Sequence, residues 1–341
     1  MLLIISKQDD AHVHYLRPHL EARDIVYRWI DPGDFSARAG MTLEFGPDRV
    51  PRRRLVFDGR PFDLDEVRTV WLRQYQLPTA HDDITVPDYR RAAIDIGTSC
   101  LAGLADSLEA RWSPAKPRPS LAAQNKPHQL TVAAGFGFIV PRTTITNEPT
   151  EALRFYEECG GRIVTKAAAA IFQMSAPDGQ RLMPTHPVRR RDLANFRGLA
   201  LAPMILQEYV PKRAELRVTI VADRIFAALI DSQASTRSRH DWRHYDFDAT
   251  AYSAHQLPAT VEAACLRLLD YFGLRYGAID LVLTPEGEYV FLELNPVGQW
   301  AFIQDLTGMP IAQALAEDLD PAVATRDVFV GPGAFPSYLP A

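Results

Sequence analysis

The most informative part of the sequence reads Gly277-Ala278-Ile279-Asp280-Leu281 and then Phe291-Leu292-Glu293-Leu294-Asn295-Pro296. Both segments are apolar runs of strand length that carry a few polar side chains. Thr284-Pro285-Glu286-Gly287, a typical turn sequence, lies between them. The pattern therefore predicts two antiparallel strands, 276–283 and 288–294, joined by a short turn.

Three polar side chains of this hairpin are expected to meet. Successive side chains of a strand point to opposite faces, so Glu293 and Asn295 share a face, and Asp280 can lie beside them. Carboxylates among apolar neighbours repel one another unless a cation lies between them. An all-oxygen set is typical of Mg²⁺, with nucleotide phosphates and water as further ligands. The alternative is a hairpin with solvated acids on its outer face, but the Glu-x-Asn-Pro ending of an apolar strand favours the metal site.

Three cationic residues upstream complement this cluster. Lys126 begins a predicted helix capped by Asn125, where the helix dipole already favours anions. Lys166 ends the apolar strand 162–166, and Arg217 shares a face with Glu215 on a later strand. Each of them alone is typical of a surface charge. Together with a Mg²⁺ site they predict a triphosphate site.

A further strand ends at a proline in Gln207-Glu208-Tyr209-Val210-Pro211. Its terminal backbone donors and acceptors can pair with the edge of an adenine. Glu215 can return to the same pocket and accept hydrogen bonds from ribose hydroxyls. The alternative is an ordinary strand end with solvated charges. The sequence contains no GxxxxGK[ST] motif and no complete GxGxxG motif, so neither a P-loop nor a dinucleotide fingerprint is predicted.

The remaining sequence predicts an α/β unit followed by α+β units. Strand, helix and strand over 2–31, with a third strand at 67–73, indicate a parallel sheet, and 38–62 predicts a hairpin around Asp58-Gly59. A long helix is expected over 88–111, and a proline-rich linker over 113–119. The expected division is 1–115, 116–203 and 204–326, with a tail at 327–341.

Composition excludes several classes of protein. The 341 residues carry a net charge of −5 and are 47% hydrophobic, which disfavours nucleic acid as the main partner and a wholly disordered chain. No apolar run reaches the ~20 residues of a membrane helix, and the first residues read as a strand and not as a signal peptide. The three cysteines form no CxxC pair, so we expect reduced thiols in a cytoplasmic protein. The short apolar runs lead us to expect no membrane partner.

The nucleotide-site residues taken together resemble those of the ATP-grasp ligases over residues 115–320. The resemblance implies an ATP-grasp fold with a Rossmann-like pre-ATP-grasp domain, a central α+β lobe and a C-terminal α+β lobe. It also implies ATP and Mg²⁺, expected as two ions, as cofactors. In its terms Lys126 and Lys166 contact phosphates, Gln207, Glu208, Tyr209 and Val210 border adenine, Glu215 holds ribose, Arg217 meets the reacting phosphate, and Asp280, Glu293 and Asn295 bind the metal. Ala167-Ala168-Ala169-Ala170 departs from the glycine-rich phosphate loop of many members.

A narrower resemblance is to the graspetide (microviridin-type) peptide ligases. It rests on Asn295-Pro296-Val297-Gly298-Gln299-Trp300, on Asp305-Leu306-Thr307-Gly308-Met309-Pro310-Ile311, on Trp71-Leu72-Arg73 and on Asp241-Trp242-Arg243. It implies an enzyme that activates a side-chain carboxylate of a ribosomally made precursor peptide as an acyl phosphate. A hydroxyl or amine of the same peptide then forms an ester or amide crosslink.

Several assignments within this interpretation stay open. We expect Arg243, Asp231 and Arg239 to line the acceptor pocket, with Asp231 as one candidate general base. The predicted hairpin 171–187 either grips a leader segment of the peptide or covers the ATP cleft. A homodimer is also considered. The alternative functions are a ligase that adds free amino acids to a protein tail or small molecule, and a non-catalytic ATP-binding module.

Overall fold

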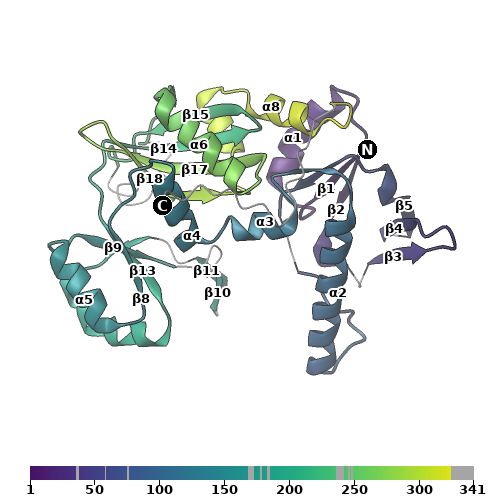
Figure 1. The fold of residues 1–341 in the computed structure, drawn as a ribbon, viewed down its shortest axis with the longest axis horizontal. Coiled ribbons are helices and arrows are strands. Elements are labelled where there is room, and N and C mark those ends of the chain that lie inside the picture. Colours follow the sequence, from purple (N-terminus) through teal and green to yellow (C-terminus); the bar gives the residue numbers. More distant parts are fainter. Residues whose placement is uncertain are drawn as a thin grey trace.

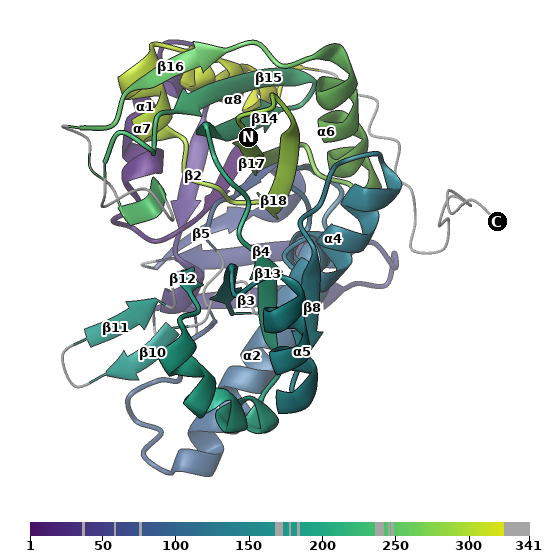
Figure 2. The ribbon, with the colours of Figure 1, turned by 90° about the vertical axis from the view of Figure 1, so that its left-hand side faces the viewer.

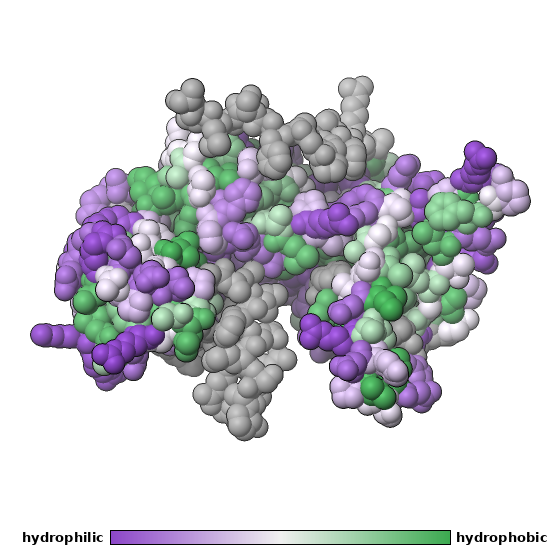
Figure 3. Space-filling model, turned by 60° about the horizontal axis from the view of Figure 1, so that its bottom comes forward, coloured by the Kyte–Doolittle hydropathy of each residue, from purple (hydrophilic) through white to green (hydrophobic). Residues whose placement is uncertain are grey.

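The computed structural model describes residues 1–35, 38–57, 59–74, 77–167, 173–176, 179–182, 185–235, 242–244, 246 and 249–323. Figure 1 shows the described chain as an elongated molecule, with the N-terminal sheets at one end and a smaller lobe around α5 at the other. In Figure 3, the parts around α5 and α2 project on the left and right of the molecule, and hydrophilic and hydrophobic residues are interspersed on this face. The tail expected at 327–341 lies outside the described residues.

The N-terminal part contains the parallel sheet that the sequence predicts. Its strand order is β2-β1-β6-β7, and all of its pairings are parallel. These strands and the first helix are β1 (Leu2–Ile5), α1 (Ala11–Glu21), β2 (Tyr27–Ile30), β6 (Thr69–Leu72) and β7 (Arg111–Ser113). A second, antiparallel sheet follows the order β3-β4-β5, and its strands are β3 (Ala39–Phe45), β4 (Pro51–Phe57) and β5 (Arg60–Asp63). The predicted hairpin is therefore confirmed, although Asp58 at its tip lies outside the described residues. Two 3₁₀ turns, Pro32–Asp34 and Leu64–Glu66, complete this part.

The predicted linker over 113–119 is wrong. The long helix α2 (Pro87–Ser107) is present but ends earlier than expected, because strand β7 begins at Arg111. A short helix, α3 (Pro117–Ala122), then starts directly at a proline. Proline suits the first helical position because its φ is already helical and the N–H it lacks has no partner there anyway. The dense prolines thus begin a helix.

The central sheet has the order β12-β9-β13-β8, with antiparallel pairings throughout. Its strands are β8 (Thr143–Thr146), β9 (Ile163–Lys166), β12 (His186–Pro187) and β13 (Met204–Glu208). Helix α5 (Pro149–Glu158) and the 3₁₀ segment η3 (Arg190–Leu201) cover it, burying Phe155 and Leu206 in a separate small core. Residues 204–208, which the expected division assigns to the C-terminal lobe, thus pair inside the central sheet. The division itself stays a prediction.

The predicted hairpin at 171–187 contains an antiparallel pair, β10 (Gln173–Ala176) and β11 (Gly179–Leu182). Its tip at 177–178 lies outside the described residues. Figure 2 shows the pair on the same side of the molecule as the central sheet, next to β12.

The C-terminal sheet follows the order β16-β15-β14-β17-β18. Its strands are β14 (Ala214–Val221), β15 (Arg224–Ile230), β16 (Tyr252–His255), β17 (Tyr276–Leu283) and β18 (Tyr289–Asn295). Helices α4 (Lys126–Gly135) and α6 (Ala259–Tyr271) pack on one face. On the other face a second core joins this sheet to β1 and α1 of the N-terminal part through α8 (Ile311–Leu319), which lies beside α1 (Figure 1).

Two helices close the described chain, α7 (Ala301–Thr307) and α8. Gly308 adopts a left-handed φ of 72° at the end of α7. Glycine takes this conformation without the steric cost that other residues meet, which ends the helix, and Pro310 precedes the next one.

Candidate active site

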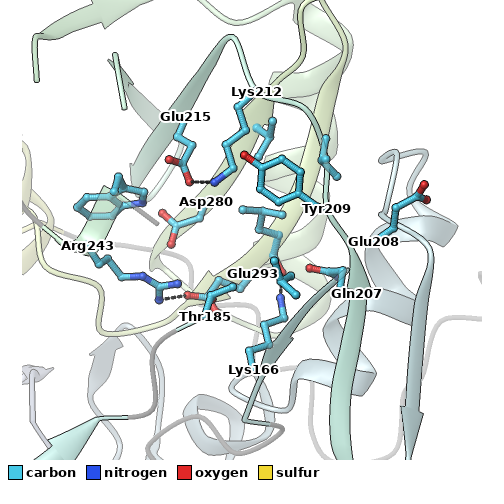
Figure 4. A pocket seen from close by; sticks show the side chains of 15 residues that line it. Lys166, Thr185, Gln207, Glu208, Tyr209, Lys212, Glu215, Arg243, Asp280 and Glu293 are labelled. Atoms are coloured by element: carbon cyan, nitrogen blue, oxygen red, sulfur yellow. Dashed lines mark hydrogen bonds and ion pairs between the residues drawn. The ribbon is translucent and has the colours of Figure 1, made fainter. Parts of the chain in front are cut away.

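A pocket lined by several charged side chains lies where the end of the central sheet meets the C-terminal sheet (Figure 4). Strands β9 and β13 supply one wall, and β17 and β18 the other. The side chains labelled in Figure 4 are Lys166, Thr185, Gln207, Glu208, Tyr209, Lys212, Glu215, Arg243, Asp280 and Glu293. Nine of the predicted site residues line this one pocket: Lys166, Gln207, Glu208, Tyr209, Val210, Glu215, Arg243, Asp280 and Glu293.

The predicted acidic cluster is present. Asp280 on β17 stands directly opposite Glu293 on β18 in the register of the two strands. Asn295 Nδ2 lies 3.2 Å from Glu293 Oε1 and 3.5 Å from Asp280 Oδ2. Both carboxylates are almost completely buried. The alternation of side chains along β18 and the turn before it produce this arrangement, as the sequence indicated.

Arg217 on β14 balances Asp280. Its Nη1 donates to Asp280 Oδ1 at 2.8 Å, and its Nη2 donates to the carbonyl of Gln299 at 3.3 Å. Burial raises the pKa of Asp280 above its usual value; the charge of Arg217 acts in the opposite direction, and that of Glu293 adds to the rise. Arg217 also lies 5.5 Å from the centre of the Trp242 ring.

Glu293 is surrounded by cations. Arg243 Nη1 lies 2.8 Å from its Oε1, and Lys126 Nζ lies 3.3 Å from its Oε2. Burial acts to raise the pKa of Glu293, but the charges of Arg243, Lys126 and Lys166 outweigh it and hold the pKa well below its usual value. Lys166 Nζ also donates to the carbonyl of Leu292 at 3.5 Å. Three cations thus converge on one carboxylate at the pocket.

The start of α4 places Lys126. Asn125 caps the helix by accepting from the N–H of His128, as the sequence predicts. Gln129, one turn later, fixes the helix to β18: its Oε1 accepts from Leu294 N at 2.9 Å and its Nε2 donates to Leu294 O at 2.7 Å. Sequence reasoning missed Gln129, because a glutamine inside a helix gives no sign that it pairs with a distant strand.

The end of β13 forms the side of the pocket where we expect adenine. The Gln207 side chain donates to Thr143 Oγ1 at 2.9 Å, and Glu208 lies apart from the acidic cluster in Figure 4. The N–H of Tyr209 donates to the carbonyl of Arg162 at 2.9 Å. The N–H of Tyr209 is therefore already hydrogen-bonded. The backbone groups expected to contact adenine are then the carbonyl of Tyr209 and the backbone of Val210.

Lys212 is a pocket residue that the sequence analysis missed. Its Nζ lies 2.8 Å from Glu215 Oε1, and both side chains are buried. A lysine three residues before a glutamate expected at the site was the available signal. Since this ion pair borders the pocket, Lys212 adds a further positive charge next to the predicted ribose ligand.

The predicted acceptor-pocket residues are only partly brought together. Arg243 reaches the acidic cluster from a 3₁₀ turn (Trp242–His244), and Trp242 stacks on Phe302 at a centroid distance of 5.6 Å. Asp231 follows β15, where its N–H donates to Ala251 O, and it does not line the pocket. Arg239 lies outside the described residues.

The donor set suits a hard divalent cation. Two buried carboxylates and one side-chain amide face one another, and hard ions prefer such oxygen ligands. Among the described residues, no group of three or more His, Cys, Asp or Glu side chains could hold a metal. The protein therefore offers a partial oxygen shell that phosphates and water would complete.

Neither a protein-family model nor a curated protein matches the chain. Solved structures do. The macrocyclase MdnC of Microcystis aeruginosa MRC, described as bound with precursor peptide MdnA, is 30% identical, with a TM-score of 0.81 over 93% of this chain and 98% of that one. A Chryseobacterium gregarium RiPP-associated ATP-grasp ligase, in complex with ADP and a leader and core peptide, is 27% identical, with a TM-score of 0.84 over 93% and 96%.

The ATP-grasp ligase PsnB, complexed with a phosphomimetic variant of a minimal precursor, Mg and ADP, is 25% identical, with a TM-score of 0.73 over 93% of this chain and 97% of that one. No helix among the described residues is long and apolar enough to cross a membrane. The predicted fold class is confirmed, since these structures match 93% of the chain. The chain therefore belongs to the RiPP-associated ATP-grasp ligases.

Proposed function

We propose that the protein is an ATP-dependent ligase that forms side-chain ester or amide crosslinks in a ribosomally made precursor peptide. The observation that carries this proposal is the buried pair Asp280 and Glu293, held between Arg217, Arg243 and Lys126 at the junction of two sheets. The descriptions of MdnC and of the Chryseobacterium ligase, both crystallised with precursor peptides, support the peptide as substrate.

ATP binds, in this proposal, along the end of β13. The backbone around Tyr209 and Val210 borders adenine, with Gln207 and Glu208 beside it, and Glu215 accepts from the ribose hydroxyls. Lys126 and Lys166 contact the phosphates. Lys126 and Arg243 already lie against Glu293. A bound triphosphate would therefore share these two cationic side chains with the Glu293 carboxylate.

Asp280, Glu293 and Asn295 would hold Mg²⁺, expected as two ions. The amide of Asn295 offers an oxygen as well as the nitrogen that faces the carboxylates here. Bound Mg²⁺ would supply neutralising charge for the phosphates. The burial of both carboxylates strengthens any interaction that they make with a cation.

The reaction follows from the poor leaving group of a carboxylic acid. An oxygen of the peptide's side-chain carboxylate attacks the γ-phosphorus of ATP, and ADP leaves. A hydroxyl or amine of the same peptide then attacks the acyl carbon, phosphate leaves, and the attacking group loses its proton. Arg217 and Arg243 stabilise the negative charge on the transferred phosphoryl group. Asp231 stays a predicted general base, which its position after β15 does not favour.

The pair β10–β11 is our proposed grip for the leader segment of the peptide. It extends from the central sheet beside the site, which suits both this role and the alternative of covering the nucleotide. Deletion of residues 177–180 should weaken peptide binding at least about tenfold and leave ADP binding unchanged. The opposite pattern would assign the hairpin to the nucleotide.

A homodimer and a cytoplasmic location complete the proposal. Neither determines the chemistry of the site. Sedimentation velocity of the purified protein tests the first, and fractionation of the source cells tests the second.

Intact-mass spectrometry tests the proposed function. A precursor peptide encoded next to this gene is incubated with the protein, ATP and Mg²⁺, in parallel with the Asp280→Asn variant and with Asp270→Asn, which changes an exposed aspartate on α6. The proposal predicts loss of whole waters with the wild type and Asp270→Asn but not with Asp280→Asn. Addition of amino-acid mass would indicate a free amino-acid ligase instead. An unchanged peptide with bound ATP would indicate the non-catalytic module.

A further inference from the structure

The segment after the metal-binding strand is held at nearly every backbone position. Residues 296–300 leave β18 directly after Asn295. Gly298 N donates to the carbonyl of Asn295 at 3.1 Å, and the Tyr276 hydroxyl donates to the carbonyl of Gly298 at 2.6 Å. Arg217 donates to the next carbonyl, that of Gln299. This segment, called the clamp loop below, therefore connects a proposed metal ligand to Arg217, the arginine proposed to meet the reacting phosphate.

The N-terminal part holds the other side of the clamp loop. Arg73, directly after β6, donates through Nη1 to the carbonyl of Val297 at 2.5 Å. The N–H of Trp300 donates to Nε2 of His12, in the first turn of α1, at 3.2 Å. Arg73 is 4% exposed and His12 is 8% exposed. Two side chains more than 200 residues away in sequence thus bond to the loop that follows Asn295.

Asp10 fixes these two side chains. Its Oδ1 accepts from the backbone N–H of His12 at 2.9 Å and lies 3.4 Å from Nδ1 of the His12 ring. Its Oδ2 accepts from Ser6 Oγ at 2.5 Å and lies 3.7 Å from Arg73 Nε. Burial acts to raise the pKa of Asp10, but the hydrogen bond from His12 and the charge of Arg73 outweigh it and lower the pKa to about 2. Asp10 is therefore ionised near neutral pH and lies against both side chains.

His12 is suited to accept a hydrogen bond. Burial lowers the pKa of its ring, and although Asp10 acts in the opposite direction, the charges of Arg73 and Arg217 act with burial. A neutral imidazole has one lone pair. It accepts from the N–H of Trp300 when Nδ1–H is directed at Asp10 Oδ1, 3.4 Å away, and from Arg73 Nη2, 3.0 Å from Nδ1, in the other tautomer; an imidazolium accepts from neither.

Adhesion between the two parts does not require these polar groups. A continuous apolar core, which includes Leu16, Trp71, Trp300 and Leu315, already joins α1 and β6 to α8. A buried charge network carries a desolvation cost that a purely apolar contact avoids. That cost is offset only by well-placed charges and additional hydrogen bonds, and two such bonds join Arg73 and His12 to the clamp loop.

We propose that Asp10, His12 and Arg73 are positioning residues for the nucleotide site. They hold the clamp loop so that Asn295 and Arg217 stay in register with Asp280 and Glu293 when Mg²⁺ and nucleotide bind. The N-terminal part is thereby a working component of the site. The identity of the ligand rests on the proposed function; the mechanical role does not.

The test compares Arg73→Met with Arg111→Met. Arg111 is also a buried arginine of the N-terminal sheet that donates to distant backbone carbonyls, those of Asp320 and Val323, but it does not contact the clamp loop. A second pair changes His12: His12→Gln can keep an acceptor near the place of Nε2, whereas His12→Asn is too short to do so. All four are compared with the wild type by thermal denaturation.

Two measurements report on the loop itself and need no peptide. Hydrogen exchange of residues 296–300 should become at least about tenfold faster in Arg73→Met and His12→Asn, and the Kd of ADP in the presence of Mg²⁺ should rise by a similar factor. Arg111→Met and His12→Gln should change both by less than about twofold. Equal effects in Arg73→Met and Arg111→Met, or unchanged exchange and ADP affinity in Arg73→Met, would overturn the proposal. A failure of peptide ligation alone would count only against the proposed function.

Discussion

Gly298 is a residue at which the packing of the site leaves no room for a side chain. A Cβ placed there would lie under 3.0 Å from Ala278 Cβ, 2.8 Å from Arg217 Nη2 and 3.3 Å from the carbonyl oxygen of Asn295. Ordinary carbon–carbon contacts are about 3.5–4.0 Å, so the shortfall at Ala278 is on the order of 1 Å. Ala278 lies on β17 between two paired strands and is 0% exposed, so it cannot yield. The clamp loop or Arg217 must move instead.

The magnitude of the Gly298→Ala effect follows from this geometry. Overpacking of a well-packed core costs about 1–3 kcal/mol in stability. A displacement of about 1 Å in a group that faces the reacting atoms can lower turnover by on the order of 100-fold. We therefore expect kcat for ATP consumption in the presence of peptide to fall at least about tenfold, which corresponds to about 1.4 kcal/mol.

Gly103→Ala is the matched control. Gly103 lies inside α2, and a Cβ there would meet no atom within 4 Å. Alanine in a helix is favoured over glycine by about 0.5–1 kcal/mol, so this variant should be slightly more stable and fully active. Initial rates and thermal denaturation of both variants provide the comparison. Wild-type stability and turnover in Gly298→Ala, or equal losses in both variants, would refute the reasoning.

Three further predictions concern the charges of the site. Asp280→Asn should raise the Mg²⁺ concentration that half-saturates ADP binding at least about tenfold, measured by calorimetry, whereas Asp270→Asn, at an exposed position, should not. The same half-saturating Mg²⁺ concentration in both variants would count against Asp280 as a metal ligand. The pKa of Glu293 is held below its ordinary value of 4.5, so the carboxylate stabilises the fold fully above pH 4.5 and loses this contribution as the pH falls further. In urea denaturation series, the difference in stability between the wild type and Glu293→Gln should therefore shrink below pH 4.5. A constant difference would contradict the lowered pKa of Glu293. Lys212→Met should weaken ATP binding about tenfold and the exposed Lys7→Met should not, and unchanged affinity in Lys212→Met would remove that lysine from the site.

The features that the sequence predicts well are local. Alternation along β18 and the turn before it are properties of neighbouring residues, and they are sufficient to bring Asp280 and Glu293 face to face. The cap of α4 by Asn125 and the parallel pairing of β1 with β2 and β6 depend on similarly short patterns. These patterns carry most of the nucleotide site.

The features that the sequence does not predict depend on packing between distant segments. Arg243 reaches Glu293 because its neighbour Trp242 stacks on Phe302, and no spacing in the sequence encodes that contact. The bonds from Arg73 and His12 to the clamp loop are of the same kind. The prolines at the start of α3 mislead for a different reason, because one residue type both ends and begins helices.

The most direct test follows one oxygen atom of the peptide. A precursor peptide whose side-chain carboxylates carry oxygen-18 is incubated with the protein, ATP and Mg²⁺, and the released phosphate is analysed by mass spectrometry. If the carboxylate is activated by attack on the γ-phosphorus, one labelled oxygen appears in phosphate for each crosslink formed. Crosslinked peptide with unlabelled phosphate would contradict activation through an acyl phosphate, and with it the role given to Arg217 and the acidic cluster.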